Sequence, residues 1–105
     1  MPMEKAILLT IITERVMEPT LKELVERMGA QGYTIEDVAS GWGKHGNRTG
    51  ELESDQTFKM LLVVSTPVAQ RIIQEIERSL QPEYAITVFQ HEVDVMTRVP
   101  ASPGS

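Results

Sequence analysis

The chain has 105 residues, enough for one domain with a single modest core. Its apolar fraction of 41% and its net charge of −5 are ordinary for a globular protein, and the lack of a basic helix or stripe argues against a nucleic-acid partner. The absence of cysteine excludes disulfides and thiolate metal clusters. Because no apolar run reaches membrane-spanning length and the first residues lack a signal-peptide pattern, we expect a cytoplasmic protein with no direct membrane insertion.

The first part of the chain predicts a strand, a helix and a second strand. Residues 6–12 form a continuous apolar run, typical of a strand covered on both faces. Pro19 suits the first turn of a helix, and Gly29 and Gly32 mark its end. Between them lies one apolar stripe at helical spacing: Leu21, Leu24, Val25 and Met28. Residues 33–39 are partly alternating and rich in β-formers, which predicts the second strand.

The second part predicts another strand, helix and strand. Residues 57–64 alternate clearly, with one face made of Phe58, Met60, Leu62 and Val64. Residues 65–67 have the sequence of a helix start, and Pro82 closes that helix. Its buried stripe is predicted to be Ala69, Ile72, Ile73, Ile76 and Leu80. A last strand over about residues 86–95 is expected to carry a bulge near residues 90–91.

This β-α-β-β-α-β order predicts an α+β, ferredoxin-like fold. In that fold, two helices cover one face of a four-stranded antiparallel sheet. The other face of the sheet keeps apolar residues, which indicates that other subunits bury it. We assign residues 1–99 to one domain and residues 100–105, which are rich in Pro, Ser and Gly, to a disordered tail.

The connection between the second and third strands is much longer than a hairpin requires. Its glycines allow backbone N–H groups to come close to a ligand, and Lys44 and Arg48 add positive charge to an acidic chain. These features predict a cradle for a phosphate or carboxylate group. A solvated surface loop is the alternative interpretation.

The flanks of this loop resemble the PII signal-transduction family. GAQGYT at residues 29–34, then Val38, then GWGK at residues 41–44 are similar to the end of the family's first helix, its second strand and the base of its T-loop. KMLLVV at residues 59–64 resembles its third strand, and residues 88–98 resemble its last strand and C-terminal basic segment. The resemblance covers nearly the whole chain and implies a single PII-like domain, with residues 41–56 as a shortened T-loop.

Where the chain departs from the general PII pattern, it resembles one branch of the family. The tyrosine that nitrogen regulators carry for uridylylation is missing, and residues 81–84 replace a loop rich in glycine and lysine. Where the family has a pair of C-terminal arginines, this chain has Met96 and Arg98. The pattern is similar to PII-like proteins associated with carboxysomes and bicarbonate transporters. That branch implies a homotrimer that binds adenine nucleotides in clefts between subunits, with bicarbonate as a second ligand.

The resemblance also implies which residues contact the ligand. The nucleotide-binding set is Thr34, Gly41, Trp42, Gly43, Lys44, Val63 and Arg98, and the candidates for an anion or second ligand are His45, Gly46 and Arg48. In this set the Thr34 hydroxyl meets the adenine edge and the Val63 backbone contacts the base. Plainer roles remain open for these residues: β-propensity for Thr34, core packing for Val63 and solvated charge for Arg48 and Arg98. Trp42 can stack on a base, shield the ligand or anchor the loop.

We therefore expect a regulatory sensor and not an enzyme, with no covalent cofactor, no catalytic residue and no metal site. Its ligands would be adenine nucleotides, with ADP and AMP favoured over ATP, and bicarbonate. Ordering of the loop would control a transporter or carboxysome-related partner in inorganic-carbon metabolism or transport. The alternative is a small ferredoxin-like hydrolase of acylphosphate or nucleotide. That chemistry needs a glycine loop between the first strand and first helix, and residues 13–17 contain no glycine.

Overall fold

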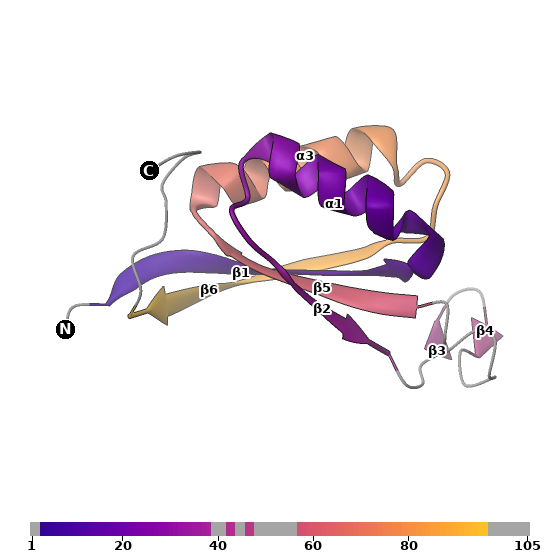
Figure 1. Ribbon diagram of the computed structural model, residues 1–105, viewed down its shortest axis with the longest axis horizontal. Helices are drawn as coiled ribbons and strands as arrows, with labels where there is room; N and C mark the ends of the chain where they lie inside the picture. Colours follow the sequence, from indigo (N-terminus) through magenta and orange to yellow (C-terminus); the bar gives the residue numbers. More distant parts are fainter. Residues whose placement is uncertain (1–2, 39–41, 44–45, 48–56, 97–105) are drawn as a thin grey trace.

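A computed structural model describes residues 3–38, 42–43, 46–47 and 57–96. The elements in chain order are β1 (Glu4–Glu14), the 3-10 turn η1 (Arg15–Met17), α1 (Glu18–Met28), β2 (Thr34–Asp37), β3 (Trp42–Gly43), β4 (Gly46–Asn47), β5 (Thr57–Val64), α3 (Thr66–Ser79) and β6 (Thr87–Val95). The main sheet is antiparallel, has four strands in the order β2-β5-β1-β6, and carries both helices on one face (Figure 1). The predicted ferredoxin-like fold is confirmed.

The hydrophobic core lies between the sheet and the two helices. Successive side chains of a strand point to opposite faces, so β1 and β5 each bury every second residue beneath the helices. The helices close the core with residues spaced by three and four: Leu21, Leu24, Val25, Val68, Ala69, Ile72 and Ile76. Both predicted helical stripes are largely confirmed, although Ile73 is only partly buried and Val68 takes a core position that its sequence context did not indicate.

Three local features differ from the expectations. The bulge expected near residues 90–91 is wrong, since β6 pairs with β1 in continuous register from Thr87 opposite Ile12 to Val95 opposite Glu4. The turn η1 between β1 and α1 was not predicted, nor was the small ladder in which β3 pairs with β4. The proposed tail, residues 100–105, lies outside the described residues.

The sheet face opposite the helices presents apolar side chains to the outside. The register places Leu8 opposite His91 and Thr10 opposite Phe89 on this face, and Leu61 opposite Thr34. Val63 and Phe89 are 46% and 43% exposed there, so two strands contribute large apolar side chains to the same open face. An exposed apolar sheet face of this kind marks a contact surface. Within the described residues, no helix is long and apolar enough to cross a membrane.

Candidate ligand cleft

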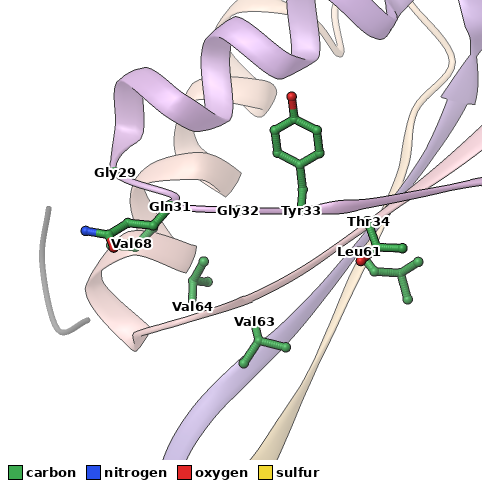
Figure 2. A pocket seen from close by; sticks show the side chains of 9 residues that line it. All are labelled: Gly29, Gln31, Gly32, Tyr33, Thr34, Leu61, Val63, Val64 and Val68. Atoms are coloured by element: carbon green, nitrogen blue, oxygen red, sulfur yellow. The ribbon is translucent and has the colours of Figure 1, made fainter. Parts of the chain in front are cut away.

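The turn that follows α1 shapes one wall of a cleft. Gly29 caps the helix with φ of 116°, in the left-handed region, and its N–H donates to the Glu26 carbonyl at 3.1 Å. The Ala30 N–H donates to the Val25 carbonyl at 2.9 Å. Among the described residues, Gly29 alone has a positive φ. This cap reverses the chain after α1 and brings the following residues alongside the end of β5 (Figure 2).

The cleft has a volume of about 280 Å³ and lies between this turn, the end of β5 and the first turns of α3 (Figure 2). Its lining is Gly29, Gln31, Gly32, Tyr33, Thr34, Leu61, Val63, Val64 and Val68. One wall is therefore aliphatic, and the other is mainly backbone with the polar side chains of Gln31 and Thr34. An apolar wall facing a few polar groups is the usual composition of a site for a small organic molecule.

The side chains at the rim differ in what they offer a ligand. Tyr33 points toward α1, where its hydroxyl donates to Glu26 Oε2 at 3.3 Å, so the residue presents mainly backbone to the cleft (Figure 2). Thr34 lies beside Leu61, its register partner on β5 (Figure 2). Val63 is almost half exposed. At Gly32, an added Cβ would meet no atom within 4 Å, so open space lies beside its backbone.

The structure brings together two of the predicted ligand residues, Thr34 and Val63, in this cleft. Trp42, Gly43 and Gly46 belong to the β3–β4 ladder, where Trp42 pairs with Asn47 and Gly43 with Gly46. The remaining candidates, Gly41, Lys44, His45, Arg48 and Arg98, lie outside the described residues.

Sequence reasoning did not assign a ligand role to the other seven residues that line the cleft: Gly29, Gln31, Gly32, Tyr33, Leu61, Val64 and Val68. Gln31 stands between the two glycines that end α1, and that position was a usable signal for a backbone-rich wall. Val68 joins the cleft only because the start of α3 packs near the end of α1, which is a long-range arrangement. Among the described residues, no group of three or more His, Cys, Asp or Glu side chains is placed to hold a metal ion.

The sequence and the fold match those of one protein family. The sequence model of the family described as nitrogen regulatory protein P-II matches residues 6–101. The chain therefore belongs to the P-II family, and solved PII-like proteins share its fold.

Solved structures give more detail on these relatives. A PII-like signaling protein from Thermus thermophilus is 34% identical over 90% of this chain and 93% of its own, with a TM-score of 0.74. CPII from Thiomonas intermedia, bound to ADP and bicarbonate, is 26% identical over 89% of this chain and 90% of its own, with a TM-score of 0.80. GlnK from B. subtilis in complex with ATP is 18% identical over 85% and 82%, with a TM-score of 0.63, and shows the fold alone. The search of curated proteins gives no match.

The cap of α1 provides a stability prediction. Replacing Gly29 with alanine forces a Cβ into the left-handed region, so we expect the free energy of unfolding to fall by roughly 1 kcal/mol. Urea denaturation followed by circular dichroism measures this change. Gly32→Ala is the matched control, because its φ is not positive and its Cβ meets open space; its stability should stay within about 0.5 kcal/mol of the wild type. Equal losses in both variants would contradict this account of the cap.

Proposed function

We propose that the chain is a regulatory sensor, not an enzyme, that binds an adenine nucleotide in the cleft between Gly29 and Val68. The supporting observation is the cleft itself, which combines an aliphatic wall with exposed backbone in a chain that belongs to the P-II family. CPII, its structural neighbour, is known bound to ADP, AMP and bicarbonate. We take adenine nucleotides and bicarbonate as the ligands of this chain on that basis.

The cleft suits the base of a nucleotide better than its phosphates. A flat adenine ring can lie against Leu61, Val63 and Val68, while the Thr34 hydroxyl and nearby backbone groups meet its polar edge. The described lining contains no lysine or arginine. Phosphate contacts must therefore come from other parts of the chain, and Lys44, Arg48 and Arg98 are the proposed donors. With few cations to share among the phosphates, ADP and AMP are favoured over ATP.

The open sheet face supports a trimeric assembly. Leu61 and Val63 belong both to this face and to the cleft, so a neighbouring subunit that covers the face would also approach the ligand. A cleft completed by the neighbour explains why the single chain leaves Val63 almost half exposed. Homotrimer formation and nucleotide binding would then be coupled, because the neighbouring subunit and the nucleotide both contact Leu61 and Val63.

The proposed T-loop links ligand binding to a partner protein. We propose residues 1–99 as one PII-like domain, with residues 41–56 as a shortened T-loop and residues 100–105 as its tail. Ligand occupancy would set the loop conformation, and the loop would then bind or release a partner protein. A transporter or carboxysome-related protein of inorganic-carbon metabolism is the partner class that the resemblance implies.

A ligand screen tests the proposal. We would measure the midpoint of thermal unfolding with ATP, ADP, AMP and cyclic AMP, each with and without bicarbonate. Ligand at about 100 times its Kd stabilises the folded protein by about 2.7 kcal/mol, so an upward shift with ADP or AMP is expected. A flat response to every nucleotide would refute the proposal. Steady release of phosphate from a nucleotide or acylphosphate would refute its non-enzymatic part.

A further inference from the structure

A single arginine joins the turn η1 to the edge of the sheet. Arg15 Nη1 donates to Glu18 Oε1 at 3.0 Å, and its Nη2 donates to Asp37 Oδ1. Glu18 is held in turn by Lys22, whose Nζ lies 2.8 Å from Glu18 Oε2. The chain of charges runs from the first turns of α1 through Arg15 to the last residue of β2.

The same guanidinium also contacts β5. Its central carbon lies 5.6 Å from the ring centroid of Phe58, a cation–π distance, and Phe58 is fully buried. Phe58 and Asp37 are direct register partners in the β2–β5 ladder. Arg15 therefore contacts both residues of one cross-strand pair. It donates a hydrogen bond to Asp37 and lies over the face of the Phe58 ring.

Strand β2 is a short edge strand, and besides its ladder with β5 the exposed ion pair of Glu36 with Lys59 at 3.5 Å joins it to the sheet. It has four residues, sits at the edge of the sheet and pairs only with β5. Apart from the partly buried Ile35, its residues are exposed, so little burial opposes local opening. Its first residue, Thr34, lines the cleft, and its last residue, Asp37, is the one that Arg15 binds.

We propose that Arg15 is a positioning residue that holds β2 against β5 and so fixes the Thr34 wall of the cleft. The part concerning ligand affinity rests on the proposed nucleotide site, whereas the part concerning β2 does not. Among the described residues, Arg15 is the cation that pairs with Asp37, and its side chain is 35% exposed against 80% for Asp37. Loss of this contact should therefore open β2 locally and leave the rest of the fold intact.

The surrounding charges favour the ionised forms that the anchor requires. The hydrogen bond from Lys22, and then that from Arg15, lowers the pKa of the Glu18 carboxyl. The hydrogen bonds to Asp37 and then Glu18 raise the pKa of Arg15 above its already high ordinary value. Both shifts favour the charged forms of Glu18 and Arg15, and salt should weaken the exposed ion pairs in part.

Native-state hydrogen exchange measures the proposed anchoring directly. In Arg15→Gln, amide exchange in β2 and on the side of β5 that pairs with it should accelerate by about five- to tenfold, while amides shared by β1 and β6 keep their wild-type rates. The affinity for ADP should fall by about three- to tenfold, because Thr34 is held less often in its bound position. Arg15→Lys should restore only part of the protection, since an ammonium lacks the planar fork that spans the acid and the ring.

Arg27→Gln is the matched control. Arg27 makes ion pairs of comparable length with Glu23 at 3.5 Å, within α1, and with Glu75 at 3.4 Å, between α1 and α3. This variant should leave β2 exchange and ADP affinity unchanged. Asp37→Asn removes the negative charge that Arg15 binds, at a highly exposed position. If Arg15→Gln does not fold, the same exchange and affinity measurements are made on this variant.

Each outcome decides the inference. Unchanged β2 exchange in both Arg15→Gln and Asp37→Asn overturns it, and so does acceleration spread evenly over the whole sheet. If the wild type binds no ADP, the proposed function fails while the exchange data still judge the role of Arg15. If β2 opens as expected but ADP affinity stays the same, the anchor stands and its link to the cleft is refuted.

Discussion

Replacing Phe89 with aspartate is expected to convert the proposed trimer into monomers of 11.8 kDa. Phe89 is 43% exposed on the open sheet face, so the single chain tolerates the change, while its edge-on contact with the His91 ring is lost. In the proposed trimer the same position would be covered, and an unpaired carboxylate there would be buried without compensation. Light scattering after size exclusion should give a mass near three times the chain mass for the wild type and near the chain mass for the variant.

The control for this prediction is Gln70→Asp, which makes the same charge change on the exposed side of α3. That variant should keep the wild-type mass. A wild-type protein that runs as a monomer contradicts the proposed trimer. An unchanged trimer in Phe89→Asp shows that another surface carries the assembly.

Phe58→Ala is expected to cause a larger loss of stability than any of the other substitutions. The ring is fully buried between the sheet and the helices, and it also receives the Arg15 guanidinium at 5.6 Å. Truncating a buried phenylalanine to alanine costs about 3–5 kcal/mol, because apolar contact is lost and a cavity remains. Domains of this size have free energies of unfolding of about 5–15 kcal/mol, so this substitution would remove a large part of the total stability.

Urea denaturation at one fixed protein concentration measures this effect, since the proposed subunit assembly would add to the apparent stability. Met60→Leu, a change of similar volume at another fully buried position of β5, should cost less than about 1.5 kcal/mol. A loss below about 1 kcal/mol in Phe58→Ala would show that the core does not depend on this ring.

Elements are predictable from the sequence where the spacing of apolar residues matches the face that the element buries. The alternation in residues 57–64 gives β5 with its bounds, because one face of that strand packs against the helices and the other does not. The stripe ending at Gly29 gives α1, because the left-handed cap needs a glycine at that position.

Other features depend on long-range pairing and escape a local pattern. Strand β1 begins at Glu4, in a polar stretch, because β6 pairs with it there and Lys5 Nζ lies 3.1 Å from Asp94 Oδ1. The expected bulge in β6 is absent because polar residues near its middle face solvent within a regular ladder. Polar residues at an exposed edge do not require a break in pairing.

The cleft was only partly predictable for the same reason. Thr34 and Val63 were identified through a family resemblance, and the structure places both in the cleft. Val68 belongs to the helix that follows β5 and reaches the cleft only through tertiary packing. The anchor from Arg15 to Asp37 spans two elements that no short motif connects, and it becomes visible only when the register of β2 and β5 is known.

Titration calorimetry with ADP tests most directly whether the cleft beside Gly32 binds an adenine nucleotide. The wild type should bind one ADP per subunit. Gly32→Val should fold normally, because a side chain there enters open space, and should lose binding, because the added methyl groups occupy the cleft. No heat of binding in a folded wild-type protein, or equal affinity in a folded Gly32→Val variant, would contradict the account.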